Sequence, residues 1–172
     1  MAKVEIIHIG EINIPMVVTP VYAQRVIHID RTLRGMTMPK FSKQSLTKLE
    51  TCHPELQHLF NLVIRKIDCR VLEGYRDKEC QEQYFAEGKS KVQWPNGKHN
   101  QQPSQAVDIV PYPIEWSNIK RWYYFGGIVL GIAHAIDVSI RWGGDWDGDS
   151  SFTDQTFHDL PHFELKATNA GK

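Results

Sequence analysis

The sequence predicts an α+β domain in which a small, mainly antiparallel sheet packs against helices. Segments with apolar residues at helical spacing are interspersed with short segments in which apolar and polar residues alternate. The regular strand–helix–strand repetition that builds parallel sheets is missing from this order. The chain has 172 residues, of which 41% are hydrophobic. A single domain of this size buries roughly 70% of its unfolded surface, so a packed core is expected.

The first 37 residues are rich in Ile and Val. Alternation in residues 5–9 and again in residues 25–29 predicts short strands that pair as a hairpin. The composition changes at about Met38. We therefore divide the chain into an N-terminal extension of unknown role (residues 1–37), a main domain (residues 38–168) and a short tail (residues 169–172).

The first half of the main domain is predicted to contain two helices and a strand. Ser42 is placed to cap a short helix that runs through Glu50. Pro54 fits the first turn of a second helix, and apolar residues then recur at helical spacing: Leu56, Leu59, Phe60, Val63, Ile64 and Ile67. Residues 69–73 form a strand that ends at Gly74.

The second half alternates helices, strands and polar loops. Asp77 is placed to cap a helix that runs to about Glu87, and residues 89–104 read as a loop. The remaining predicted elements are, in order, a strand at 106–110, a largely apolar and therefore mostly buried helix at 117–136, a strand at 138–142, a loop rich in Gly and Asp at 143–160, and a strand at 162–165.

Charge and composition exclude several classes of protein. The 20 Lys and Arg residues balance 20 Asp and Glu residues, so no net charge attracts nucleic acid or an anionic membrane. No apolar run reaches the roughly 18 residues of a membrane span, and no signal-peptide pattern is seen at the N-terminus. Cys52, Cys69 and Cys80 are odd in number and form no C-x-x-C pair, so we expect free thiols in a reducing compartment.

Two histidines and two aspartates form a pattern that fits catalytic zinc. His99 and Asp108 flank the loop that enters one predicted strand, and His162 begins another. Two imidazoles and one carboxylate are a common ligand set that leaves one position open for water. Asp159 lies three residues before His162 and is placed to take a proton from that water and pass one to a leaving amine. The same spacing also fits a capped loop with solvated carboxylates and a partly buried His162.

Several separated motifs resemble one known family, and they occur in that family's order over residues 39–166. They are Phe41-Ser42, His53-Pro54-Glu55-Leu56, Leu72-Glu73-Gly74-Tyr75-Arg76, Gln81, Gly88-Lys89-Ser90-Lys91, Lys98-His99-Asn100, the run from Pro103 to Pro113, Arg141-Trp142-Gly143-Gly144-Asp145-Trp146, and Asp159-Leu160-Pro161-His162-Phe163-Glu164-Leu165. The chain resembles the zinc peptidoglycan peptidases of the VanY and VanX type, and most of all their phage-endolysin branch of L-alanyl-D-glutamate endopeptidases. The resemblance implies the fold shared by D-alanyl-D-alanine peptidases and the hedgehog signalling domain.

The resemblance also implies roles for individual residues. It implies that His99, Asp108 and His162 bind Zn²⁺ and that Asp159 is the general base. Arg76 is expected to face the substrate, because its planar fork of donors suits a peptide carboxylate or carbonyl. The alternative for Arg76 is a surface ion pair with Asp77 or Glu73.

Two further residues are expected to contact the substrate. Gln81 lies one helical turn beyond Arg76 and is expected to orient it or the substrate; the alternative is a solvated helix position. Trp142 is expected to wall the cleft, although packing is the more ordinary role for a tryptophan in a strand.

The chain departs from the common family pattern near the first ligand. Gly97 stands where the family has Ser. His99 and Asp108 are nine positions apart, two more than in the usual form, with Pro103 and Ser104 in the added length. The ligand assignment survives this change, but the loop geometry is left open.

An acidic loop is a second candidate metal site. Asp145, Asp147, Asp149 and Asp154 lie within residues 143–154, and no Lys or Arg occurs between Arg141 and Lys166. Such carboxylates suit a hard cation such as Ca²⁺, and some endolysins of this type respond to calcium. The alternative is a solvated loop.

These residues lead to one main functional prediction. We expect a zinc-dependent endolysin that cuts peptidoglycan stem peptides, at the L-Ala–D-Glu bond, by water attack with an Asp general base. The alternatives are a D-Ala-D-Ala carboxypeptidase of the same fold and a non-catalytic, zinc-containing module that binds the cell wall. We expect a monomer that stays in the cytoplasm of the bacterial host until a partner holin releases it, with no membrane insertion and no nucleic-acid partner.

Overall fold

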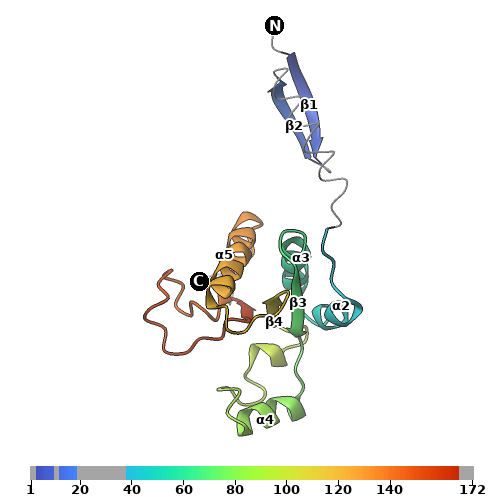
Figure 1. Cartoon of the computed structure of the whole chain (residues 1–172). Helices are drawn as coiled ribbons and strands as arrows, with labels where there is room; N and C mark the ends of the chain where they lie inside the picture. Colours follow the sequence, from blue (N-terminus) through green and yellow to red (C-terminus); the bar gives the residue numbers. More distant parts are fainter. Residues whose placement is uncertain (1–2, 10–11, 19–37, 167–172) are drawn as a thin grey trace, which may run out of the picture. The chain divides into compact units, whose positions relative to one another are not determined.

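The computed structural model describes residues 3–9, 12–18 and 38–166 (Figure 1). The chain divides into two compact units, Met1–Met38 and Pro39–Lys172. Within the part of the chain that the structure describes, no helix combines the length and the apolar character that a membrane span requires.

The first unit contains an antiparallel hairpin. β1 (Lys3–Ile9) pairs with β2 (Ile12–Val18), in a register that runs from Lys3 opposite Val18 to Ile9 opposite Ile12. The predicted strand at 5–9 is confirmed as part of β1, whereas the partner predicted at 25–29 lies outside the described residues. The strand β2 was not predicted from the sequence, because Pro15 interrupts its apolar pattern. Both strands of a two-stranded sheet are edges, where proline is tolerated.

Three short helices of the second unit begin where the sequence places their caps. They are α2 (Lys43–Leu49), α3 (Pro54–Val63) and α4 (Lys78–Ala86). The Ser42 hydroxyl accepts a hydrogen bond from the Ser45 amide at 3.2 Å, and Asp77 accepts one from the Cys80 amide at 2.9 Å. These bonds satisfy amide groups that the first helical turn leaves without a partner.

The predicted α+β class, with its antiparallel sheet, is confirmed. The sheet contains β3 (Cys69–Glu73), β4 (Ala106–Pro111), β5 (Ile140–Trp142) and β6 (His162–Leu165). Their spatial order is β3-β4-β6-β5, and every neighbouring pair is antiparallel. The last of the described strands, β6, therefore lies inside the sheet, between β4 and β5.

One face of this sheet packs against helices. Val107 and Ile109 of β4 and Phe163 of β6 have no exposed surface. The Phe163 ring lies 5.6 Å from that of Phe60 on α3 and 6.0 Å from that of Phe125 on α5 (Ile119–Ala135), measured between centroids. Since successive side chains of a strand point to opposite faces, the residues between these core positions face away from the helices.

Helix α5 is buried along one side only, which corrects the expectation of a mostly buried helix. Tyr124 is 66% exposed. The buried side includes Gly126, where an added Cβ would lie 2.6 Å from the ring of Trp142. The absence of a side chain at Gly126 thus lets the helix approach the sheet closely.

The predicted loop at 89–104 contains one turn of 3-10 helix, η1 (Lys98–Asn100). The Asn100 side chain folds back and accepts a hydrogen bond from the Gly97 amide at 3.0 Å. It also donates to the Arg76 carbonyl at 3.0 Å. This turn is fixed at the open face of the sheet, where it carries His99.

Candidate metal centre

Two of the predicted metal ligands lie on neighbouring strands. Asp108 on β4 and His162 on β6 are direct partners in the antiparallel register. Each occupies the alternate position to a core residue, so both point to the face that the helices leave open. His99 reaches the same place from η1, nine residues before Asp108 in the chain.

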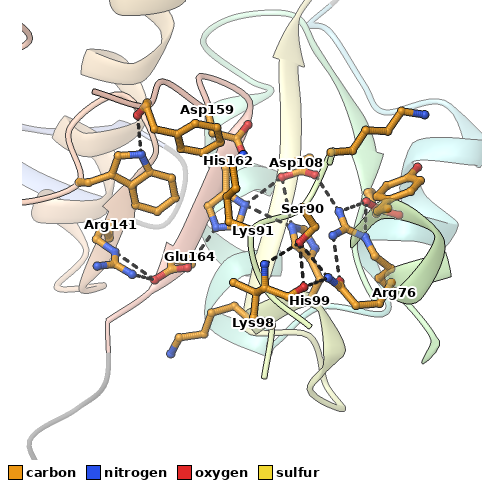
Figure 2. Close-up of a pocket in the computed structure, with 18 of the residues that line it drawn as sticks. Arg76, Ser90, Lys91, Lys98, His99, Asp108, Arg141, Asp159, His162 and Glu164 are labelled. Atoms are coloured by element: carbon orange, nitrogen blue, oxygen red, sulfur yellow. Dashed lines mark hydrogen bonds and ion pairs between the residues drawn. The ribbon is translucent and has the colours of Figure 1, made fainter. Parts of the chain in front are cut away.

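The three side chains converge closely (Figure 2). His99 Nε2 lies 3.2 Å from Asp108 Oδ1 and 3.2 Å from His162 Nδ1, and His162 Nδ1 lies 3.1 Å from Asp108 Oδ1. These atoms form a group that could hold a metal ion. Ligands bound tetrahedrally to zinc at about 2.0–2.1 Å lie about 3.3 Å from one another, so the observed triangle fits such an ion.

The outer ring nitrogens support the same interpretation. His99 Nδ1 lies 2.7 Å from the Gly74 carbonyl oxygen, and His162 Nε2 lies 3.1 Å from Glu164 Oε2. A carbonyl and a carboxylate accept hydrogen bonds, so each outer nitrogen carries the proton. The inner nitrogens, which lie next to Asp108, are then the atoms that would bind a metal ion, and the outer acceptors fix the orientation of both rings.

The electrostatic environment of the cluster favours the ionised forms of Asp108 and His162. Burial acts to raise the pKa of Asp108, but His99 and His162 outweigh it and hold that pKa well below its usual range. Burial acts to lower the pKa of His162, but hydrogen bonds to Asp108 and Glu164 outweigh it and raise the pKa to about 9. The cluster therefore binds positive charge, which is a proton when no metal ion is present.

Asp159 lies at the edge of the same pocket. Burial raises the pKa of its carboxyl, and the negative charge of Asp108 adds to the effect. Its amide donates to the Gly143 carbonyl at 2.8 Å, and its carbonyl accepts from the His162 amide at 3.0 Å. A Cβ on Gly143 would lie 2.3 Å from the Asp159 carbonyl oxygen, so this approach requires glycine at position 143.

Arg76 combines the two alternatives left open by the sequence. Its guanidinium pairs with Glu73, through Nε at 2.9 Å and through Nη2, and it also lines the pocket. Nη2 lies 3.6 Å from Asp108 Oδ2, and the guanidinium lies over the Tyr84 ring at 4.7 Å. Asp77 instead caps α4.

Gln81 is only 1% exposed, so the solvated alternative is wrong. Its Oε1 accepts hydrogen bonds from Arg76 Nη1 and from Asn100 Nδ2, both at 3.1 Å. Its Nε2 donates to Ser90 Oγ at 2.8 Å and to the Val92 carbonyl. Gln81 thus connects Arg76, the turn that carries His99, and the loop that follows α4.

The expectation that Trp142 walls the cleft is corrected. Trp142 is 1% exposed and stacks on Phe163 in the core. Its Nε1 donates to the Leu160 carbonyl at 2.9 Å, which fixes the segment next to Asp159. The tryptophan that lines the pocket is Trp146, whose ring lies 5.5 Å from that of His162.

Glu164 is a site residue that was not predicted from the sequence. It contacts His162 Nε2 and is paired with Arg141, at 3.0 Å to Nε and 2.6 Å to Nη2. A signal was present, because a residue two positions after His162 in a strand shares its face.

The acidic loop brings three of its four aspartates together. Carboxylate oxygens of Asp145, Asp147 and Asp149 lie within 4.8 Å of one another, and Asp154 is not part of this group. The buried Asp145 already accepts hydrogen bonds from the amides of Gly148 at 2.9 Å and Ser150 at 3.1 Å. These bonds shape the loop whether or not a cation is present.

The cluster opens into a pocket of about 870 Å³. Arg76 and Gln81 line it, and so do Trp146 and Phe157 of the loop before β6. The volume is within the range of sites that enclose a small ligand or a few residues of a peptide.

Comparisons with known proteins agree with this geometry. Residues 36–166 match the family model described as phage L-alanyl-D-glutamate peptidase. Among solved structures, the chain is similar to the crystal structure of the Serratia marcescens L-Ala D-Glu endopeptidase ChiX, with 25% identity and a TM-score of 0.62. That match covers 78% of this chain and 95% of ChiX. The search of curated proteins found no match.

Proposed function

Since the chain belongs to the phage L-alanyl-D-glutamate peptidase family and is a peptidoglycan peptidase, we propose that it hydrolyses the L-Ala–D-Glu bond of the stem peptide at a zinc site formed by His99, Asp108 and His162. One observation carries the proposal. Three donor atoms on three segments converge within 3.2 Å, and the outer nitrogens of both imidazoles are held by acceptors.

Zinc bound to these residues would supply Lewis-acid chemistry and would lower the pKa of a water molecule toward about 7. The chain's own residues supply the other parts of the reaction. Glu164 and the Gly74 carbonyl orient the two imidazoles, and Asp108 places a negative charge between them.

Asp159 is proposed as the general base. Its carboxylate takes a proton from the attacking water and passes it to the nitrogen of the leaving amine. The raised pKa of Asp159 suits this role, because the carboxyl group must both accept and release a proton near neutral pH.

Arg76 is proposed to bind the substrate. A guanidinium has five N–H donors. Glu73 and Gln81 engage three of them, on Nε, Nη1 and Nη2. One donor on Nη1 and one on Nη2 are not engaged by these two residues, although Nη2 also lies 3.6 Å from Asp108 Oδ2. These donors are proposed to bind a carbonyl or carboxylate of the peptide, while the partners of the other three fix the plane of the group.

The test is hydrolysis of purified peptidoglycan by the full chain loaded with zinc. New amino termini are expected, and mass spectrometry of the fragments should find cleavage between L-Ala and D-Glu. Asp159→Ala should bind zinc as the wild type does, measured by elemental analysis, yet release at least 100-fold fewer amino termini.

Other outcomes identify the alternatives. Release of free D-Ala would indicate a D-Ala-D-Ala carboxypeptidase of the same fold. Binding to the wall without any new amino terminus would indicate a non-catalytic module. Loss of zinc in Asp159→Ala would remove the evidence for a general base.

The biological setting is proposed from the family. A phage peptidase of this kind is expected to remain in the host cytoplasm, as a monomer, until a partner holin gives it access to the wall. Residues 38–168 are proposed as the peptidase domain. Light scattering of the full chain tests the expected monomer.

A further inference from the structure

The pocket in front of the His–Asp–His cluster has an excess of positive side chains, although the whole chain has no net charge. Six basic residues line it: Lys48, Arg76, Lys89, Lys91, Lys98 and Arg141. Only four acidic residues do so.

Both arginines already form ion pairs with carboxylates of the protein. Arg76 pairs with Glu73, and Arg141 Nη2 lies 2.6 Å from Glu164 Oε1. Both ion pairs are at least partly buried. The charges of these arginines are therefore largely compensated before any substrate arrives.

Two of the four lysines also have partners within the protein. Lys89 Nζ pairs with Glu87, and Lys48 Nζ donates to the Leu72 carbonyl. Lys91 and Lys98 differ from them. Among the described residues, neither has a carboxylate within 4.0 Å or a side-chain hydrogen bond, and Figure 2 draws both among the side chains that line the pocket.

The backbone that carries these two lysines is held in place. Gln81 Nε2 donates to Ser90 Oγ and to the Val92 carbonyl, on either side of Lys91. The Lys98 carbonyl accepts from the Gln105 amide at 3.0 Å. A held backbone reduces the entropy lost when a flexible ammonium group binds a ligand.

The substrate offers a matching charge. A glutamate whose amine is acylated by alanine keeps two carboxyl groups. One of them continues the peptide, and the other is free next to the scissile bond. This free carboxylate would be repelled by Asp108 and Asp159, unless other groups in the pocket offset their charge.

We propose that Lys91 and Lys98 bind the free carboxylate of the substrate's glutamate and so determine specificity for an acidic rather than an amidated residue. The inference rests on the proposed function, because that function supplies the glutamate. Ammonium groups suit this role, since they approach a single carboxylate without the fixed geometry of arginine.

The test compares two synthetic peptides that contain L-Ala–D-Glu and differ only at the free group, which is a carboxylate in one and a primary amide in the other. The wild type should prefer the acid. In the Lys91→Met/Lys98→Met variant, kcat/KM for the acid should fall about tenfold or more, as expected for loss of a charge-assisted hydrogen bond, while the amide should be cleaved as before. Lys91→Arg/Lys98→Arg should keep most of the preference.

Lys66→Met/Lys120→Met is the matched control, because both lysines are exposed and neither lines the pocket. It removes the same number of positive charges and should leave the preference unchanged. Equal losses on both peptides, no loss on either, or the same effect in the Lys66→Met/Lys120→Met control would each overturn the proposal.

A binding measurement separates this proposal from the proposed function. Calorimetry with N-acetyl-D-glutamate and the full chain should show binding that weakens about tenfold or more in the double Met variant and little in the control. If the wild type cleaves neither peptide, the assigned bond is wrong, and calorimetry still decides the role of the lysines. Absence of binding to the wild type, or equal binding to the wild type and the double variant, overturns the proposed role of Lys91 and Lys98.

Discussion

His162 contacts a carboxylate with each of its ring nitrogens. Nδ1 lies 3.1 Å from Asp108 and Nε2 lies 3.1 Å from Glu164. These contacts raise the pKa to about 9 from the ordinary 6.5. In the metal-free protein, the protonated ring therefore stabilises the fold fully below pH 6.5, and this contribution is lost as the pH rises through about 9.

The first prediction concerns proton release. At pH 7 the metal-free cluster holds a proton that must leave when zinc binds, so about one proton should be released per ion and the affinity should rise with pH up to about 9. Calorimetry in two buffers of different ionisation enthalpy measures this number. Zinc binding without proton release would contradict the raised pKa of His162.

The second prediction concerns Glu164. Replacing it with Gln removes the charge that orients His162 and should weaken zinc binding about tenfold or more. A competing chromogenic chelator measures the affinity. Glu87→Gln changes the charge equally at an exposed site outside the pocket, and it should leave the affinity unchanged. Equal effects in both variants would show that Glu164 acts only through overall charge.

At the scale of elements, successive side chains of β4 and β6 face alternately the core and the pocket. Val107, Ile109, Phe163 and Leu165 face the helices, while Asp108, His162 and Glu164 face the pocket. Strand periodicity and cap residues can be read from a sequence, so β3, β6 and the starts of α2 and α4 were predicted closely. The order of the strands in the sheet, and the position of Trp146 rather than Trp142 at the pocket, depend on long-range packing and could not be predicted. The strand β2 is local to β1, and it was missed because Pro15 interrupts its pattern.

The site was predicted unevenly for the same reason. The ligand triad and Asp159 came from motif and spacing, and the structure brings the three triad side chains together. For Arg76, the sequence could not decide between contact with the substrate and an ion pair with Glu73. Only the folded chain shows that Arg76 pairs with Glu73 and also lines the pocket. Glu164 was missed, although its spacing from His162 carried the signal.

The third prediction concerns the contact between α5 and the sheet. Gly126→Ala places a methyl group against the Trp142 ring and should destabilise the protein by about 1–3 kcal/mol. At Gly127 an added Cβ meets nothing within 4 Å, so Gly127→Ala should stabilise by about 0.5–1 kcal/mol. Urea unfolding measures both. The same sign of change at the two positions would contradict the close approach.

The fourth prediction concerns the acidic loop. Mutual repulsion of Asp145, Asp147 and Asp149 is relieved when a cation binds, so millimolar Ca²⁺ should raise the melting temperature of the zinc-loaded protein. Asp147→Asn/Asp149→Asn should abolish the rise while keeping the hydrogen bonds from the Gly148 and Ser150 amides to Asp145. If calcium changes neither melting temperature nor activity, the loop is only a solvated turn.

At the scale of the whole molecule, the described site belongs entirely to one unit. Every residue that lines the pocket falls between Lys48 and Glu164, inside the unit Pro39–Lys172. The family match begins at residue 36, close to the start of that unit. The catalytic machinery therefore has no described contribution from the first unit.

The fifth prediction follows from this division. A truncated chain that starts at Met38 should fold cooperatively, bind one zinc ion and cleave peptidoglycan about as fast as the full chain. Circular dichroism melting and metal analysis test it. A truncated chain that does not melt cooperatively would show that the N-terminal residues belong to the core.

The position of β6 has a consequence for biosynthesis. This strand is inserted between β4 and β5, yet it is the last of the sheet's strands that the ribosome makes. Until it emerges, β4 and β5 have no shared neighbour, and both His162 and its partner Glu164 are absent. On the proposed assignment of His162 as a metal ligand, the nascent chain is therefore expected to be inactive until the insertion of β6 completes the sheet.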